Sequence, residues 1–228
     1  MDSKSKKKIQ RSWMMYDFGN SAFATTIMAA VLPVYYSTVA ASGLDDHLAT
    51  SYWGYSQSIS VLIVAILAPI LGAISDFSAA KKKNFFVFFA FMGIIASILM
   101  IFISEGDYLL ASLLFIIGSI GFSGGNIFYD GFLPEIAEKE EMDKVSSGGF
   151  AYGYIGGGIL LAINVMMILN PSWFGIADTE WATRISLASV GIWWLIFTIP
   201  LLKNIKEEKK RESGTDEIIC INRFSTSG

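Results

Sequence analysis

The sequence has little of what soluble proteins and enzymes commonly use. Among its 228 residues there is one cysteine, Cys220, and one histidine, His47, and only 16% of the residues are charged. A single cysteine excludes a disulfide within the chain, and a single histidine leaves no cluster of metal ligands. The sequence contains no nucleophile elbow, phosphate-binding loop or paired-histidine motif, so we expect neither an enzyme nor a cofactor. It also has no basic face with interleaved aromatic residues, so we expect no nucleic-acid partner.

Apolar residues are abundant, at 53% of the chain, and they gather in six runs long enough to cross a lipid bilayer. The runs are residues 13–39, 53–75, 84–104, 108–130, 148–169 and 182–202. A soluble helix bundle would need a polar face on most of its helices, and these runs have almost none. The sequence therefore predicts an all-α, multi-pass integral membrane protein with six transmembrane helices.

The basic residues orient this protein. If the amino terminus is cytoplasmic, all but one of the 17 Lys and Arg residues lie on the cytoplasmic side, and the exception is Arg184. The positive-inside rule then places both termini and Lys82 inside, and Asp46 and Asp178 outside. A cleaved secretory signal is the alternative for the first run, but that run is too long and carries Asp17 near its start.

The predicted organisation has three parts. Residues 1–12 form a basic cytoplasmic amino terminus, residues 13–202 form the six-helix transmembrane domain, and residues 203–228 form a polar, disordered cytoplasmic tail. Within the domain, the third and sixth runs are expected at the periphery of the bundle. Pro33 in the first run permits a kink.

The first and fourth runs each carry a one-sided polar stripe, because their polar residues recur at helical spacings of three and four. A carboxylate within a membrane helix is costly unless it faces water or a partner, so its presence indicates function. The alternative is that these carboxylates lie at the interface, complementing a helix end or pairing with nearby lysines. The residues that we assign to a substrate or ion pathway are Asp17, Asn20, Ser21, Asn126 and Asp130.

The fifth run carries glycines every four residues, at Gly149, Gly153 and Gly157. This spacing puts three bare backbone positions on one helix face, which lets a second transmembrane helix approach closely. We expect Gly153 to contact the second or the first run.

A loop after the second run has a recognisable pattern. Gly72 is followed four residues later by Asp76 and then by the basic cluster Lys81, Lys82 and Lys83. This pattern resembles the signature loop of the major facilitator superfamily. The resemblance implies a cytoplasmic gating loop, whose lysines we expect to hold it at the membrane surface.

Several further motifs occur in order along residues 11–203. They are Trp13-x-x-Tyr16-Asp17, Pro33-Val34-Tyr35-Tyr36, Phe128-Tyr129-Asp130 with Leu133-Pro134-Glu135, and Val145-Ser146-Ser147-Gly148 before Gly153-Tyr154-Ile155-Gly156-Gly157. Together they resemble the vacuole-effluxer-like branch of the major facilitator superfamily. Its eukaryotic members are autophagy-related vacuolar amino-acid exporters, and its bacterial members are mostly uncharacterised permeases.

The resemblance implies the amino-terminal six-helix half of a permease in the cytoplasmic membrane of a bacterium. Such a permease moves a small polar solute, such as an amino acid, by alternating access. In that fold the first and fourth spans line the central cavity, so Asp17 and Asp130 would lie near one water-filled mouth. Two carboxylates there can bind a proton or a cation.

Members of that branch continue into a second six-helix half, and this sequence ends where that half would begin. A partner chain or a second copy of this chain can supply the missing half. Alternatively, the sequence comes from a truncated or frame-shifted gene, and its product is a membrane remnant or scaffold without transport. Both alternatives stay open at the level of the sequence.

Overall fold

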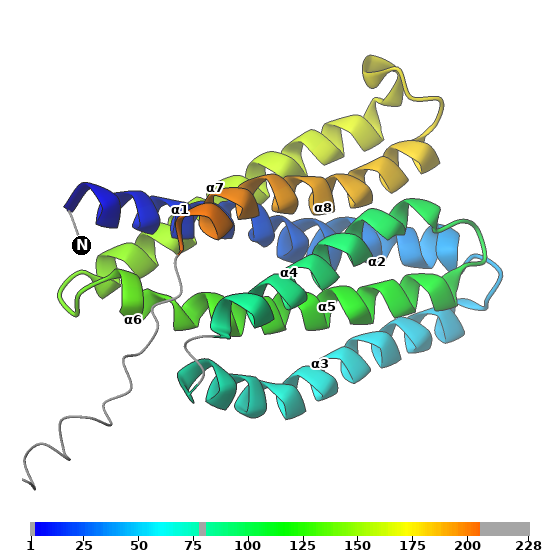
Figure 1. The fold of residues 1–228 in the computed structure, drawn as a ribbon. Coiled ribbons are helices and arrows are strands. Elements are labelled where there is room, and N and C mark those ends of the chain that lie inside the picture. Colours follow the sequence, from blue (N-terminus) through cyan, green and yellow to red (C-terminus); the bar gives the residue numbers. More distant parts are fainter. Residues whose placement is uncertain (1–2, 78–80, 206–228) are drawn as a thin grey trace, which may run out of the picture.

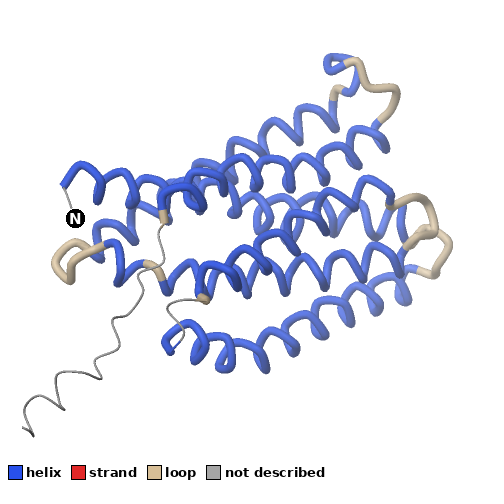
Figure 2. The backbone as a smooth tube through the Cα atoms, viewed as in Figure 1, coloured by secondary structure: helices blue, strands red, loops and turns tan. Residues whose placement is uncertain are grey.

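The computed structural model describes residues 3–77 and 81–205 of the chain. Within these residues the fold is helical without strands, and six helical spans are long and apolar enough to cross a membrane. Figure 2 shows these helices joined by short loops. The prediction of an all-α membrane protein with six transmembrane helices is confirmed.

The spans are built from the following elements. The first consists of α1 (Ser3–Ala22), the π-helix η1 (Phe23–Ala30), α2 (Val31–Tyr35) and the π-helix η2 (Tyr36–Ala40); the others are α3 (Asp46–Phe77), α4 (Lys82–Leu99) with η3 (Met100–Phe102), α5 (Tyr108–Gly131) with the short α6 (Leu133–Ile136), α7 (Met142–Leu169) followed by η4 (Pro171–Phe174), and α8 (Thr179–Asn204). Because α1 begins at Ser3, most of the predicted amino-terminal segment continues the first helix. Residues 206–228, most of the predicted tail, lie outside the described residues.

The first span is regular in its first half and irregular in its second. The α-helical pattern gives way to wider π-helical turns from Phe23 onward, and Ala30 has φ −114° and ψ −61°. Pro33 lies within α2 and has no N–H to donate to the preceding turn, which interrupts the ladder of backbone hydrogen bonds. The polar stripe of the first span therefore lies on regular helix, and the irregular turns lie beyond it.

The six spans lie side by side, and the start of α1 and the end of α8 lie at the same end of the bundle (Figure 1). We call this the inner end, because it is the predicted cytoplasmic side. α1 packs against α7 and α8, α4 packs against α5 and α8, and α3 packs against α5. The most hydrophobic windows of α3 and α7 are 17% and 33% buried, whereas those of the other four spans are each 44% buried. The peripheral placement predicted for the third and sixth runs is therefore wrong.

Glycine allows α4 to sit in the core. A Cβ added to Gly121 of α5 would collide with the backbone of Gly93 in α4, so the two helices cross in direct contact. The indole ring of Trp194 from α8 lies against Gly93 and is fully buried. Small residues on α4 and α5 thus make room for a large aromatic side chain from α8.

Candidate functional site

The polar stripes of the first and fourth spans meet inside the bundle. The side-chain Nδ2 of Asn20 in α1 donates a hydrogen bond of 2.6 Å to Oδ1 of Asn126 in α5. Asn20 is 1% exposed and Asn126 is half-buried. A hydrogen bond between two amides satisfies polar groups that would otherwise be costly away from water. The two residues form a polar seam in an otherwise apolar bundle.

Asp17 and Ser21 lie one helical turn apart on α1 and face the glycines of α7. Ser21 Oγ donates a hydrogen bond of 3.3 Å to Asp17 Oδ1. A Cβ added to Gly153 would lie 2.5 Å from Ser21 Oγ and 3.2 Å from Asp17 Oδ2. The bare backbone at Gly153 therefore leaves the space that the half-buried carboxylate and its serine partner occupy.

The rest of the glycine ridge also lies along the first span. A Cβ on Gly149 would lie 2.7 Å from the Trp13 ring, and one on Gly157 would lie 3.0 Å from Cγ2 of Thr25. Gly156 makes a still closer approach, because a Cβ there would collide with the backbone carbonyl of Phe18. Gly156 is not part of the four-residue repeat that predicted the packed face, although the three consecutive glycines at 156–158 were a visible signal.

Asp130, the second carboxylate of the stripes, lies exposed at the inner end of α5. Within residues 3–77 and 81–205 neither Asp17 nor Asp130 forms an ion pair with a lysine or arginine, and Asp130 accepts no side-chain hydrogen bond. Pairing with nearby lysines, the alternative considered for these residues, therefore gains no support.

Several buried polar atoms beside the stripes lack a hydrogen-bond partner among the described residues. They are the hydroxyl oxygens of Tyr16 and Tyr129 and Oδ1 of Asn20. Such an atom costs roughly 1–3 kcal/mol when it stays unpaired. These atoms lie next to the Asn20–Asn126 hydrogen bond, so polar groups are concentrated in this part of the bundle interior.

The loop residues of the predicted gating motif fall into two groups. Gly72, Asp76 and Lys81 form the first group: a Cβ on Gly72 would meet no neighbouring atom within 4 Å, and the side chains of Asp76 and Lys81 are exposed.

The other two lysines point into the protein instead of toward the membrane surface. Lys82 is 6% exposed, and its Nζ donates to the carbonyl of Gly131 at 2.8 Å and to Glu135 at 2.5 Å. Lys83 Nζ donates to the carbonyls of Leu202 and Ile205 at 2.8 and 2.9 Å. A cation at a helix carboxyl end satisfies carbonyls that have no partner within the helix. These lysines tie the start of α4 to the ends of α5 and α8.

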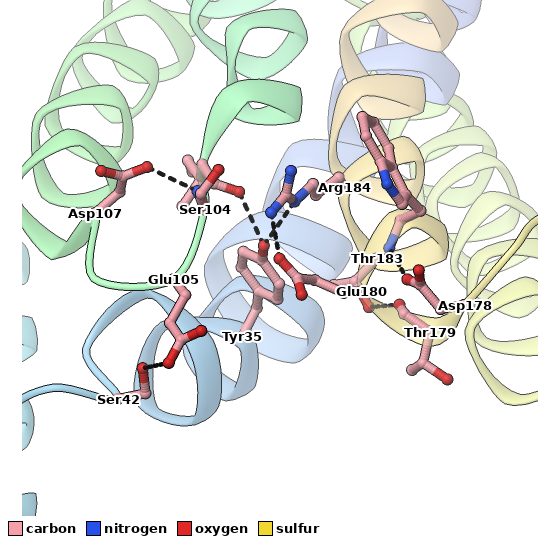
Figure 3. Close-up of polar contacts among 12 residues, drawn as sticks. Tyr35, Ser42, Ser104, Glu105, Asp107, Asp178, Thr179, Glu180, Thr183 and Arg184 are labelled. Atoms are coloured by element: carbon pink, nitrogen blue, oxygen red, sulfur yellow. Dashed lines mark hydrogen bonds and ion pairs between the residues drawn. The ribbon is translucent and has the colours of Figure 1, made fainter.

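The outer end holds a polar cluster that the sequence analysis did not predict. Figure 3 shows the side chains of Tyr35, Glu180 and Arg184 turned toward one another. Tyr35 donates its hydroxyl hydrogen to the carbonyl of Ile103 at 2.9 Å, and Arg184 Nε donates to the Tyr35 hydroxyl at 3.1 Å. Arg184 also forms an ion pair with Glu180, one turn earlier in α8. The available signal was that Arg184 is the one basic residue predicted outside.

A cavity of 480 Å³ adjoins this cluster, between the first span, α7 and α8. Its walls are mostly apolar and include Val31, Val34, Val165 and Leu169. The charged groups nearby already satisfy one another. This cavity is therefore poorly suited to a polar solute.

A bundle of six membrane-length helices with a polar seam in its interior defines an integral, multi-pass membrane protein. More particularly, the chain belongs to the vacuole effluxer Atg22-like family, whose model matches residues 45–227. The resemblance drawn from the sequence motifs is thereby confirmed.

The chain is similar to curated relatives from bacteria and fungi. It is 39% identical to the uncharacterized MFS-type transporter YxiO of Bacillus subtilis over 225 residues, which cover 97% of this chain and 51% of that protein. It is 28% identical to autophagy-related protein 22 of Coccidioides immitis over 202 residues, covering 66% of this chain and 32% of that protein. The chain thus spans about half the length, or less, of these relatives.

Proposed function

We propose that this chain is one six-helix half of a secondary transporter that moves a small polar solute, such as an amino acid, by alternating access. In such transporters the solute binds near the interface between two repeats, and access alternates as one repeat rocks against the other. The names of the relatives support the transporter class, since they describe an MFS-type transporter and a vacuole effluxer. The bacterial relative supports a cytoplasmic membrane location.

The observation that carries this proposal is the hydrogen bond between Asn20 and Asn126. It joins two polar stripes within apolar helices, beside the half-buried carboxylate of Asp17 and the exposed carboxylate of Asp130. Ionisable residues inside a membrane bundle usually mark a solute or ion pathway. We assign the coupling of solute movement to a proton or another cation to Asp17 and Asp130, and solute contact to Asn20, Ser21 and Asn126.

The second half, in this proposal, packs along α3 and α7. These two spans are the least buried of the six. Their exposed apolar side chains include Tyr55, Ile66, Phe150 and Tyr154. A second six-helix half or a second copy of the chain would cover such a surface, and lipid would cover whatever it leaves.

The test is transport in proteoliposomes that contain this chain together with the carboxyl-terminal half of the Bacillus subtilis relative. Accumulation of radiolabelled amino acids is measured over a range of pH and with an imposed proton gradient. Asp17→Asn and Asp130→Asn are expected to remove accumulation or its dependence on pH while the melting temperature stays unchanged. Asp45→Asn, on the exposed outer loop, is the matched control and should transport normally.

Two results would count against the proposal. If both aspartate variants transport like the wild type at every pH, neither carboxylate couples transport. If the folded chain transports no solute with either the added half or a second copy, the alternative of a non-transporting remnant or scaffold is favoured.

A further inference from the structure

A cleft of 430 Å³ lies at the inner end of the bundle, between the end of α3 and the start of α4. We call it the Lys81 cleft; it is lined by Leu71, Lys81, Asn84, Phe85, Phe88 and Phe89. Its volume is within the range of about 300–1,000 Å³ found for small-molecule sites. It is separate from the polar stripes, and Lys81 is the one residue of the predicted gating loop among its lining residues.

The walls of the Lys81 cleft are apolar and held in place by packing behind them. Phe85 and Phe89 both stack on Phe128 of α5, with ring centroids 5.4 and 6.0 Å apart. Phe88 is 61% exposed and forms the open edge. Leu71 of α3 closes the other side of the cleft. The cleft is therefore a preformed groove that suits a hydrocarbon chain.

The mouth of the cleft carries a positive charge that no acidic side chain among the described residues pairs with. Lys81 and Asn84 are exposed there, and within the described residues the Lys81 side chain forms no hydrogen bond or ion pair. The neighbouring Lys82 and Lys83 instead point to partners inside the protein. The one nearby carboxylate on α3, Asp76, does not line the cleft.

The start of α4 adds to this charge. Its first turn has no acidic residue, and its amino-terminal N–H groups have no side-chain cap. Such groups favour an anion beside the lysine.

We propose that the Lys81 cleft binds an anionic phospholipid, with an acyl chain against Phe85, Phe88 and Phe89 and the phosphate at Lys81. The arrangement of charge selects this occupant. An apolar groove with a cation at its mouth complements an anionic head group attached to a hydrocarbon chain, whereas a zwitterionic head group brings its own cation close to Lys81. The predicted cytoplasmic side is also where basic pockets between helices meet anionic lipids.

The test is lipid binding to the purified chain, measured by native mass spectrometry in detergent. Phosphatidylglycerol and phosphatidylcholine of the same acyl composition are titrated separately. The wild type should bind one phosphatidylglycerol in preference to phosphatidylcholine. Lys81→Ala should weaken phosphatidylglycerol binding about fivefold, from the interaction expected of one surface lysine. Lys139→Ala is the matched control, because Lys139 is exposed on the same predicted side. This variant should bind phosphatidylglycerol like the wild type.

Two further measurements separate the contribution of the acyl chain from that of the head group. Phe88→Ser should weaken the binding of both lipids. Glycerol phosphate, which is the head group without an acyl chain, should not displace bound lipid. Melting temperatures of all variants verify that they are folded. Any one of three results would overturn the proposal. They are equal binding of both lipids by the wild type, an equal loss of phosphatidylglycerol affinity in the Lys81 and Lys139 variants, and displacement of bound lipid by glycerol phosphate.

Discussion

At the scale of single residues, small differences in surroundings separate positions that look alike in the sequence. Gly153, Gly156 and Gly158 lie within two turns of α7, yet only the first two face the first span. Lys81 and Lys82 are neighbours, but one is exposed and the other is buried against Glu135. The consequence of a substitution for stability therefore depends on what each position faces.

Substitutions along α7 should separate the packed glycines from the exposed one. We expect Gly156→Ala to destabilise the protein by about 1–3 kcal/mol, because the new Cβ would meet the Phe18 carbonyl and the backbone must shift. Gly153→Ala should cost less, since the hydroxyl of Ser21 can turn aside, while Gly153→Leu should lower the yield of folded protein. Gly158→Ala is the control, because its Cβ would meet no atom within 4 Å. Melting temperatures in detergent rank the variants by their loss of stability. Equal melting temperatures for all variants would show that this face of α7 does not pack against the first span.

In the pair of Lys82 and Glu135, removing the partner of the buried charge should destabilise the protein more than removing the buried charge itself. Glu135→Ala leaves the Lys82 ammonium buried without a counter-charge, and we expect a loss of roughly 1–3 kcal/mol. Lys82→Met leaves the more exposed carboxylate in water and should cost less. Glu138→Ala, which removes an exposed partner of Lys6, should have the smallest effect of the three, because solvent screens this pair. Chemical unfolding of the three variants measures these losses in the free energy of unfolding. A loss for Lys82→Met as large as that for Glu135→Ala would contradict the prediction.

At the scale of the helices, their ends are fastened by side chains from distant parts of the sequence. Lys83 at the start of α4 binds the carbonyls at the end of α8, and Asn204 Nδ2 donates to Ser12 Oγ at 2.8 Å. At the start of α1, Lys6 pairs with Glu138 and Glu141 in the connector after α6. The inner ends of all these helices are thus connected by polar contacts, whereas their middles are held mainly by apolar packing.

The contact between α1 and the connector should depend on pH. The hydrogen bond from Lys6 lowers the pKa of Glu141 below its ordinary value. A folded-state pKa below the unfolded one means that the pair stabilises the protein above the unfolded pKa, about 4.3 for Glu. This contribution is lost as the pH falls through the lower, folded pKa. We therefore expect the melting temperature of the wild type to exceed that of Lys6→Met near neutral pH, with the difference shrinking in acid. Glu141→Gln should reduce the pH-dependent part, and an unchanged difference at every pH would refute this explanation.

At the scale of the whole molecule, the bundle has two unlike ends. The inner end carries the basic residues of α1 and α4. The outer end carries Glu180 paired with Arg184, Asp46 at the start of α3, and the loop that contains Asp107. Asp178 caps the start of α8 by accepting a hydrogen bond of 2.8 Å from the Trp181 amide. The positive-inside rule connects this asymmetry to the orientation of the protein in the membrane.

Cysteine labelling from each side of the membrane tests the orientation. In a Cys220→Ser background, a cysteine at Lys81 should react only from the cytoplasmic side. Cysteines at Asp46 or Ala177 should react only from outside. Lys81 and Ala177 are used because they are exposed, whereas Lys82 is buried and Asp178 caps a helix. Labelling of position 81 from outside would refute the topology.

The sequence by itself determined the class of the protein, the number of its spans and the two polar stripes. These features depend on the length and composition of single segments and on the period of one helix, so each can be read without knowing its neighbours. The spacing of Asp17, Asn20 and Ser21 is one example, and the four-residue repeat from Gly149 to Gly157 is another. The tertiary structure supplied the contacts that these residues make.

The tertiary structure alone decided which faces are buried and which polar groups meet. α4 and α8 resemble lipid-facing helices in composition. Yet the contact of Gly93 with Gly121 brings α4 against α5, and the buried Trp194 of α8 packs on Gly93. Lys82 and Lys83 look like surface lysines until the ends of α5 and α8 come beside them. Asn20 finds Asn126 more than a hundred residues away. Each of these contacts joins segments distant along the chain, and in a membrane bundle whose helices are nearly all apolar, local composition does not say which of them will pack together.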